Sequence, residues 1–506
     1  MPEFAFEEVR EWVRIARRAP PTRTKIFSEW TLHEGAPAYA RLFHLIVQDQ
    51  TGNEDGIAKA LGYESARDDA YQMLRTDLTK RLQNTLFLLD PKRAGHSASS
   101  QARQKSDVDR FTVERTLQYG SRKLGTRLAR KALKFAVEFE FWLNAMEFAM
   151  SLREDATLQG DIPKHKKYSE QYRLYLDLFE ATQRARMAME SVEVHFARSS
   201  AEKPWLAVSL RERLVEVEVD RDRFKTFGLA LAALQIRGAV AQIEMHSRDA
   251  LRVCVDAEAL IAANPKFANR FLSYRWVVKR LKCAFHLRDY SEAASAIASC
   301  ESLEMTGENN WFVYQEYAFL IAMHTEDFER ASTLAREVTQ HPRFDVQSDS
   351  VRERWEIYSP FGKLLSGDSI AYNGPKDVRQ WVPHLSPDKA GFNVSLLILQ
   401  LLVWIKDGDE KAIFEKIDKL RTYIARNLVP IGSEQTTLFL KLLLLLDRYL
   451  LAEKEALNEV ALVLAEIESL PNADVESVQA MPYPWVWEQI VGARRKHDAV
   501  LSPAIG

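Results

Sequence analysis

The sequence predicts an all-α protein in which an N-terminal helical, helix-turn-helix-like domain precedes an α-solenoid of divergent helical hairpins. Three observations support this class. Gly and Pro contribute only 19 and 18 of the 506 residues, well below the roughly 12% of an average chain. Apolar residues recur every three or four positions over most of the chain, which is the period of an amphipathic helix. Several short passages also resemble one another at intervals typical of helical repeats.

Residues 1–90 are predicted to form the N-terminal domain. Its helices are expected before Pro20-Pro21, over 38–48, over 57–61 and over about 65–89. The last of these has leucines spaced by four and three, which places them on one helix face. These leucines are Leu74, Leu78, Leu82, Leu86 and Leu89.

Residues 54–65 and the helix after them have the pattern of a helix-turn-helix. A short Ile-Ala-x-x-Leu-Gly helix, a turn and a second helix follow one another, as in DNA-binding motifs. Three interpretations are open: packing of three helices, DNA binding, or contact with a protein. Asp68 and Asp69 oppose DNA binding, because they would face phosphates. The side chains available to reach base edges are Arg67, Tyr71, Gln72 and Arg75.

Residues 91–106 are predicted to be a basic, mobile linker, because they are small and polar and show no periodicity. The hairpin solenoid is expected over 107–365, opening with a strongly helical stretch over 108–152. One side of that stretch has the pattern of a continuous core stripe, formed by Leu124, Leu128, Ala132, Phe135, Phe139, Trp142 and Met146. The opposite side is a basic face, formed by Lys123, Arg127, Arg130 and Lys134.

The formal charge of −2 conceals an uneven distribution. Residues 91–134 contain twelve Lys or Arg against three acids, whereas 450–480 contain seven acids against one Lys. The basic face and its linker suit a polyanion such as nucleic acid, or an acidic protein partner. The alternative is a solvated helix face that pairs with the acidic C-terminal region. The linker cations concerned are Lys92, Arg93, Arg103 and Lys105.

Two passages in the middle of the chain are alike. They are Arg288–Ala293 (RDYSEA) and Glu326–Ala331 (EDFERA), and their alanines lie 38 residues apart. Each provides an Asp near a helix cap, an aromatic residue, and a small residue where two helices cross closely. Similar passages occur at 247–250 and 408–412.

This pattern resembles the tetratricopeptide-repeat superfamily, whose unit is about 34 residues long with small and aromatic residues at fixed places. Ala331 matches the small residue that begins the second helix of the unit, and Asp327-Phe328 match the turn before it. Ala318 and Ala322 match packing positions of the first helix, and Pro342 matches the end of the unit. The resemblance covers about 240–345. The Leu-Gly pair of the family's first helix is missing, and the repeat lengths vary.

Residues 366–392 concentrate Pro and Gly and are expected to be an irregular joint. C-terminal hairpins and a capping tail are expected over 393–506. Trp485 and Trp487 of that tail would cover the end of the solenoid, or dock a partner. The order of the basic helix, the DKAGFNVSLLILQ segment and the PYPWVW tail also resembles an uncharacterised bacterial helical-repeat family, which implies no activity.

Several classes of function are not expected. The three cysteines, Cys254, Cys283 and Cys300, form no CxxC and argue against a disulfide framework or a zinc ribbon. HExxH, ExxH, G-x-S-x-G and true phosphate-loop motifs are missing, so we expect no enzyme, catalytic residue, metal or cofactor. No apolar run reaches the roughly 20 residues of a membrane span. The N-terminus lacks the basic start of a signal peptide, so a cytoplasmic protein is expected.

The sequence favours a non-enzymatic scaffold, adaptor or regulatory subunit that binds a protein partner in the groove of its solenoid. The alternative is a nucleic-acid-binding regulator that uses the helix-turn-helix-like element and the basic helix at 122–134. Repeat proteins of this kind also occur beside bacterial conflict systems, which makes antiphage defence a further alternative by analogy. The cations expected to line the groove are Arg275, Lys279, Arg280 and Lys282.

Overall fold

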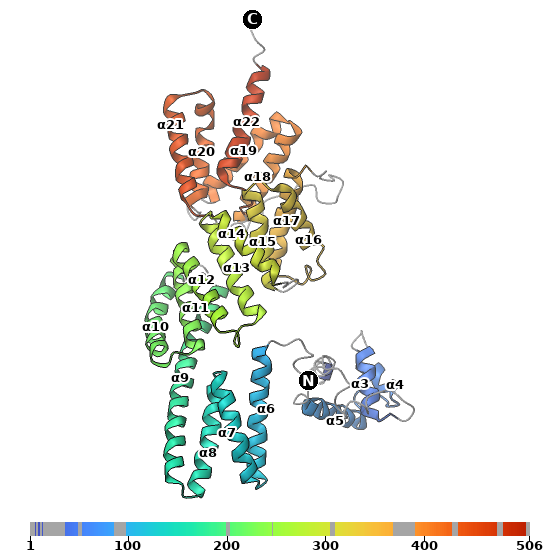
Figure 1. The fold of residues 1–506 in the computed structure, drawn as a ribbon. Coiled ribbons are helices and arrows are strands. Elements are labelled where there is room, and N and C mark those ends of the chain that lie inside the picture. The colour runs from blue at the N-terminus through green and yellow to red at the C-terminus, as the bar shows by residue number, and fades with distance from the viewer. Residues whose placement is uncertain are drawn as a thin grey trace. The chain divides into compact units, whose positions relative to one another are not determined.

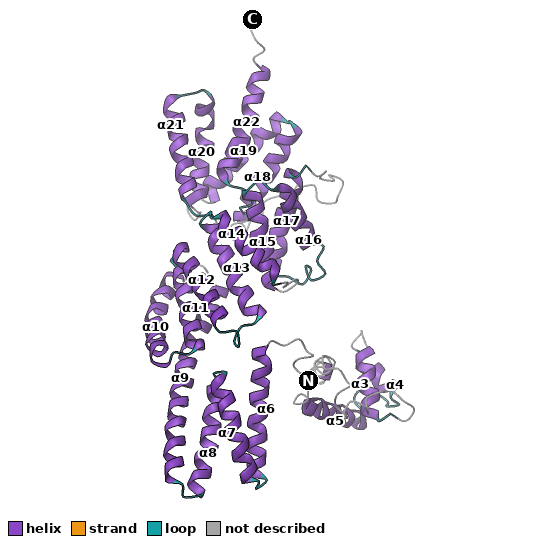
Figure 2. Ribbon diagram, in the orientation of Figure 1, coloured by secondary structure: helices purple, strands orange, loops and turns teal. Residues whose placement is uncertain are grey.

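The computed structural model describes residues 36–48, 53–85, 98–198, 203–244, 246–303, 309–367, 390–427, 434–472 and 479–501, together with Phe6, Val9, Arg10 and Val13. Over these ranges the chain consists of helices joined by turns, with no β-strand (Figures 1 and 2). The predicted all-α, solenoid-like class is therefore confirmed. Among these helices, none combines the length and the apolar character that crossing a bilayer requires.

Two compact units share the chain. Unit 1 comprises Met1–Met187, Val217–Ala230 and Ala263–Asn269, and unit 2 comprises Ala188–Glu216, Leu231–Ala262 and Arg270–Gly506. Four helices contribute residues to both units, namely α9 (Ile162–Arg198), α10 (Lys203–Phe224), α11 (Phe227–Ile243) and, by its last residue, α12 (Ser247–Ala263).

The first helices of unit 1 are α3 (Ala38–Gln48), α4 (Glu54–Ala60) and α5 (Asp69–Thr85). They share a core of their own, which includes Leu42, Tyr71 and Leu78. The helix expected from residue 65 begins at Asp69 instead, because Asp68 accepts the backbone N–H of Ala70 and so caps the helix there. Leu86 and Leu89 of the expected stripe lie outside the described residues.

Helix α6 (Ala98–Gln118) packs against α7 (Arg122–Glu138), which packs against α8 (Trp142–Leu158). The mobile linker expected over 91–106 is wrong for residues 98–106, because they begin α6; residues 91–97 lie outside the described residues. Tertiary contacts order this polar stretch. Ala102 and Ser106 are buried, and Asn144 Nδ2 of α8 donates to Ser106 Oγ at 2.9 Å.

The continuous core stripe expected from Leu124 to Met146 is also wrong. Helix α7 ends at Glu138, and Glu140 reverses the chain with a φ of 58°. A Cβ atom at Gly125 would lie 2.5 Å from the Leu117 side chain, so α6 and α7 approach closely. The buried face of α7 consists mostly of small residues: Gly125, Thr126, Ala129, Ala132, Leu133 and Ala136.

Unit 2 continues as a series of hairpins: α12 (Ser247–Ala263), α13 (Arg270–His286), α14 (Tyr290–Ser302), α15 (Asn309–His324), α16 (Phe328–Thr339) and α17 (Asp349–Leu365). The alanines predicted at helix crossings, Ala293 and Ala331, are fully buried. Helices α16 and α17 also cross closely, because a Cβ at Gly362 would lie 3.2 Å from the Ser332 backbone.

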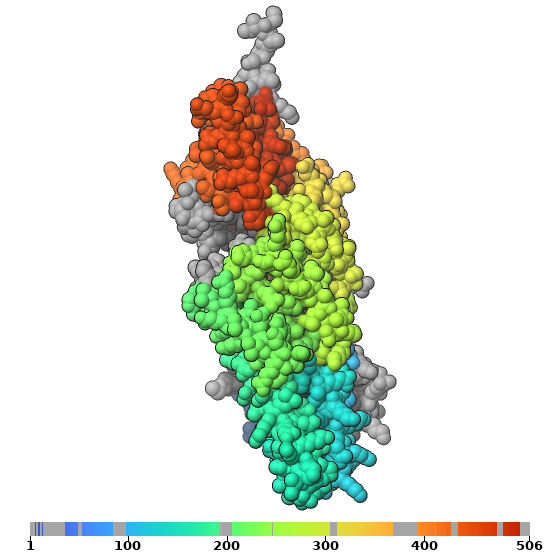
Figure 3. All heavy atoms as spheres, turned by 60° about the vertical axis from the view of Figure 1, so that its left-hand side comes forward, coloured from blue at the N-terminus to red at the C-terminus, as the bar shows by residue number. Residues whose placement is uncertain are grey.

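Five further helices complete unit 2: α18 (Ala390–Asp407), α19 (Glu410–Asn427), α20 (Glu434–Leu450), α21 (Lys454–Ser469) and α22 (Tyr483–Leu501). In the space-filling view, α20, α21 and α22 form a continuous packed surface (Figure 3). Most of the expected joint at 366–392 lies outside the described residues. The tryptophan-rich tail belongs to α22, where the buried Trp487 ring lies 5.4 Å from that of Tyr449.

A contact between distant parts of the sequence joins the C-terminal helices of unit 2 to its middle helices. Asn472, which follows α21, is buried against the end of α13. Its Nδ2 donates to the Phe285 carbonyl at 2.8 Å, and its carbonyl oxygen lies 2.7 Å from His286 Nδ1. The C-terminal hairpins thus pack on the middle ones as well as on their neighbours in the chain.

One turn recurs between helices in the described part of the chain. The first helix ends in a residue of left-handed conformation, and the next residue precedes the second helix. Arg288 (φ 57°) and Glu326 (φ 60°) are such residues, followed by Asp289 and Asp327. The N–H of Asp327 donates to the Ala322 carbonyl at 2.8 Å, and its carboxylate accepts the N–H of Arg330 at 3.2 Å. One residue therefore closes the first helix and caps the second.

We predict that Glu326→Gly raises the free energy of unfolding. The left-handed conformation costs a non-glycine residue about 1 kcal/mol, and glycine adopts it freely. The matched control is Glu415→Gly in the interior of α19, which should lower the free energy of unfolding by about 1 kcal/mol. Urea unfolding of the full chain measures both. A loss of stability in both variants would contradict the role given to this turn.

Candidate functional site

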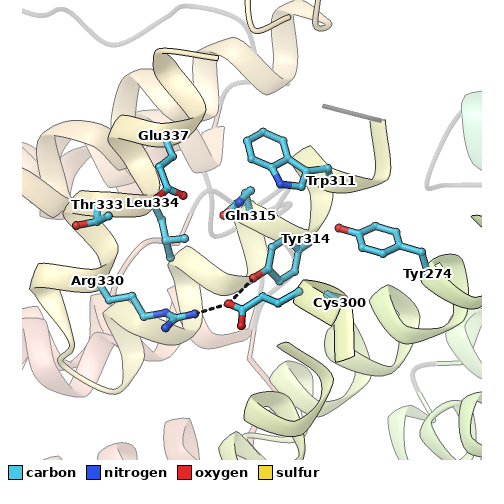
Figure 4. A pocket seen from close by; sticks show the side chains of 10 residues that line it. Tyr274, Cys300, Trp311, Tyr314, Gln315, Arg330, Thr333, Leu334 and Glu337 are labelled. Carbon is cyan, nitrogen blue, oxygen red and sulfur yellow. Dashed lines mark hydrogen bonds and ion pairs between the residues drawn. The ribbon is translucent and has the colours of Figure 1, made fainter. Parts of the chain in front are cut away.

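A cleft of about 390 Å³ opens among four helices of unit 2. Tyr274 of α13, Cys300 of α14 and residues of α14, α15 and α16 line it (Figure 4). Its base is buried and its rim is exposed, as in a site that holds one group of a larger ligand. The residues of α14, α15 and α16 that complete the lining are Glu301, Trp311, Tyr314, Gln315, Arg330, Thr333, Leu334 and Glu337.

Helical periodicity places these side chains together. The lining residues of α16 lie three, four and seven positions after Arg330, which puts them on one helix face. Trp311, Tyr314 and Gln315 follow the same spacing on α15. Helix α15 is also tied to α17, because the buried Glu316 accepts two hydrogen bonds from Arg354, at 2.8 and 3.0 Å.

Three aromatic rings form one side of the cleft. The Tyr274 and Tyr314 rings meet edge to face with their centroids 6.4 Å apart. Trp311 packs against His341 at a centroid distance of 5.0 Å, which fixes its orientation. The hydroxyl of Tyr274 points from α13 toward Tyr314 and Trp311 (Figure 4).

Glu301 organises one edge of the rim. Its Oε1 accepts a hydrogen bond from the Tyr314 hydroxyl at 3.2 Å and forms an ion pair with Arg330 Nη2 at 3.1 Å (Figure 4). The charges of Glu301 and Arg330 therefore compensate each other. Burial raises the pKa of the Tyr314 hydroxyl, and the nearby Glu301 charge raises it further, so this hydroxyl stays protonated and donates.

Two polar atoms in the base of the cleft have no hydrogen-bond partner among the described residues. They are the Tyr274 hydroxyl, on a side chain 1% exposed, and Gln315 Oε1, on a side chain 4% exposed. A buried polar atom without a partner costs about 1–3 kcal/mol. Buried polar atoms are hydrogen-bonded in the great majority of cases, and a ligand is one way to provide a missing hydrogen bond. Two unpartnered atoms therefore lie on residues that line the cleft, where a ligand could reach them.

The ionisable groups of the cleft leave an excess of negative charge at the rim. Glu337 is exposed and forms no ion pair with any described residue, whereas Arg330 is paired. Burial raises the pKa of Cys300 to about 12, so the thiol stays neutral at physiological pH. The cleft therefore combines aromatic surface, hydrogen-bond acceptors and one uncompensated carboxylate.

The predicted basic face lies on α7. Lys123, Arg127, Arg130 and Lys134 are all exposed, as is Lys131, and none of the five forms an ion pair with a described residue. Arg130 lies close enough to Lys164, at the start of α9, to oppose the rise in the pKa of Lys164 that Asp161 causes. Lys164 itself pairs with Asp161 at 2.6 Å, so the uncompensated cations of the basic face are those of α7.

The linker cations differ from those of α7. The Arg103 guanidinium lies 4.2 Å from the Phe141 ring centroid, and Lys105 Nζ lies 3.9 Å from that of Phe135. Lys105 also forms an ion pair with Asp109. These two side chains hold α6 in place, whereas Lys92 and Arg93 lie outside the described residues.

The side chains of the helix-turn-helix-like element differ in their exposure to solvent. Arg67 is exposed in the turn before α5, but Arg75 forms an ion pair with Glu54 at 2.9 Å and is only 13% exposed. Tyr71 is fully buried. The expectation that Tyr71 and Arg75 reach base edges is wrong, because they join α4 to α5.

The cations expected to line the groove lie on α13, but none of them lines the cleft. Arg280 is buried and forms ion pairs with Glu258 and Glu292, so it connects α12, α13 and α14. The Lys279 ammonium lies 4.8 Å from the Trp276 ring centroid. Arg275 and Lys282 are half-buried. The lining residue of α13 is Tyr274, which the sequence pattern did not single out.

We predict that Tyr274→Phe leaves the free energy of unfolding unchanged or raises it by up to about 1 kcal/mol, because it removes a buried hydroxyl without a partner. Tyr314→Phe is the matched control and should lower stability by about 1 kcal/mol, because its hydroxyl donates to Glu301. Urea unfolding followed by tryptophan fluorescence compares the two. Equal losses would show that the Tyr274 hydroxyl has a partner.

Comparison with protein-family models, with curated proteins and with solved structures finds no match to this chain. The resemblance of 240–345 to tetratricopeptide repeats therefore stays a prediction from the sequence. The function has to be inferred from the geometry of the cleft and of the basic face.

Proposed function

We propose that this protein is a non-enzymatic, tetratricopeptide-repeat-like binding protein, a scaffold, adaptor or regulatory subunit, and that the cleft among α13, α14, α15 and α16 holds a segment of its protein partner. The observation that carries the proposal is the pair of buried, unpartnered polar atoms in the base of the cleft, on Tyr274 and Gln315. A partner that hydrogen-bonds to them would recover the cost of their burial.

The composition of the cleft supports a protein ligand. Binding energy at protein interfaces concentrates in a few aromatic and arginine side chains within buried pockets, surrounded by a polar rim. Trp311 and Tyr314 are such side chains, and Thr333 and Glu337 provide the rim. Surfaces between stacked helical hairpins are also where repeat proteins bind extended segments.

We predict that peptides selected from a displayed library against the full chain bind in this cleft. Gln315→Met and Tyr274→Phe should each weaken the selected peptides about tenfold, as expected when a buried hydrogen bond worth about 1.4 kcal/mol is lost. Tyr119→Phe, at a highly exposed tyrosine of unit 1, is the control and should have no effect. Isothermal titration calorimetry measures the affinities. Peptides that bind all four proteins equally would contradict the proposal.

A second candidate function is binding of a polyanion, with nucleic acid as the ligand. It is favoured by one specific observation: five of the six cations of α7 are exposed and without ion pairs to described residues, whereas the sixth, Arg122, pairs with Asp155. Side chains spaced in this way along one helix can contact successive phosphates, since such contacts depend on charge rather than on sequence.

We predict that the double variant Arg127→Glu plus Arg130→Glu weakens binding of a labelled nucleic acid at least tenfold at 50 mM salt, because two phosphate contacts are lost. The slope of log affinity against log salt concentration should also become shallower by about 0.9 for each lost contact. Arg248→Glu plus Arg252→Glu, on the exposed side of α12, is the matched control. Fluorescence anisotropy of labelled duplex DNA and RNA measures the affinity. Equal affinity in both double variants would exclude the basic face as the site.

A further inference from the structure

We infer that the cleft recognises a cationic side chain of the partner, with arginine the best fit. This inference rests on the proposed function, because it assigns a chemistry to the same cleft. It follows from three properties: the aromatic surface, the unsatisfied acceptors and the balance of charge at the rim.

The aromatic surface favours a cation. Tyr274, Trp311 and Tyr314 contribute three rings to a single side of the cleft. A guanidinium or ammonium group held against aromatic faces is attracted by their quadrupoles, and the attraction strengthens when the group is removed from water. The guanidinium of arginine is planar and weakly hydrated, so it stacks on such rings more readily than the ammonium of lysine.

The unpartnered atoms favour a ligand rich in donors. Gln315 Oε1 is an acceptor that lacks a donor among the described residues. The Tyr274 hydroxyl can accept as well as donate, and burial raises its pKa, so it stays neutral. A guanidinium has five N–H donors in a fixed fork, so a single group can donate to several acceptors at once.

The charges favour a cation over an anion. Arg330 is already engaged by Glu301. Arg336 does not line the cleft, and its guanidinium donates to the Thr333 hydroxyl at 3.4 Å. Glu337 has no such partner in the described part of the chain and stands at the rim, on the same helix face as Arg330. A cationic ligand would neutralise Glu337, whereas an anionic one would bring a second negative charge beside it.

The volume of the cleft and the exposure of its rim favour a peptide side chain as the occupant. A volume of about 390 Å³ lies at the small end of ligand sites and accommodates one long side chain. Glu301, Thr333 and Glu337 at the rim are exposed, so the backbone that carries the side chain would remain outside.

The test uses the full chain and five peptides, acetyl-Gly-Gly-X-Gly-Gly-amide, in which X is Arg, Lys, citrulline, Leu or Glu. Citrulline is the neutral isostere of arginine, so the Arg and citrulline peptides differ in charge at nearly constant shape. Saturation-transfer NMR and calorimetry measure binding. We expect the Arg peptide to bind at least tenfold more tightly than the citrulline peptide, with the Lys peptide between them.

Two variants assign the effect to the cleft. Glu337→Gln should reduce the preference for Arg over citrulline several-fold, because it removes the uncompensated carboxylate. Glu329→Gln, on the same helix but outside the cleft, is the matched control and should keep the preference. Because both glutamates are exposed, neither variant removes a buried contact, and circular dichroism verifies that both fold.

The outcomes separate this inference from the proposed function. If library-selected peptides bind in the cleft but the Arg and citrulline peptides bind equally, the cleft remains a partner site and its cation specificity is overturned. A preference for the Glu peptide would also overturn the inference and assign the site to Arg330. If neither the five peptides nor the selected ones bind in the cleft, both proposals fail.

Discussion

The turn between successive helices is the constraint on which the rest of the fold depends. A left-handed residue follows one helix, and its successor caps the next, so only three residues separate the two helices of the hairpin. Arg288-Asp289 and Glu326-Asp327 perform this reversal for the hairpins α13–α14 and α15–α16. Because the turns are so short, each helix has to bury its apolar side against its predecessor, and close crossings need small residues such as Ala293 and Ala331. Among the described residues, five of the ten left-handed positions are occupied by residues other than glycine.

The cleft is a consequence of this packing. The crossings bring α13, α14, α15 and α16 together at their small residues, and the larger side chains away from the crossings leave the cleft between them. Tyr274 and Gln315 end there with unpartnered polar atoms, although Glu316, next in the chain, is fully engaged by Arg354. A closed core would have replaced those atoms by apolar groups at no cost. Their retention is consistent with a ligand that completes their hydrogen bonds.

The sequence predicted the local features of the fold better than the cleft. The Asp caps, the buried alanines at crossings and the exposed cations of α7 follow from short-range spacing, so a single sequence reveals them. Residues 311–323 of α15 are apolar or aromatic almost throughout, and most are buried, so their pattern does not show that Trp311 and Tyr314 face a cleft. Whether these two side chains face a cleft depends on how α13 and α14 pack against α15, which the sequence of α15 does not contain. The sequence also does not show that Arg75 is engaged in an ion pair, because its partner Glu54 lies 21 residues away.

The central claim is that a partner side chain enters the cleft among α13, α14, α15 and α16. Photo-crosslinking measures this most directly: the arginine peptide, with a diazirine-bearing leucine beside the arginine, is irradiated with the full chain and the attachment sites are mapped by mass spectrometry. The predicted result is attachment within residues 300–337, suppressed by an excess of unlabelled peptide. Attachment on α7 or spread over the surface, unaffected by that excess, would contradict the claim.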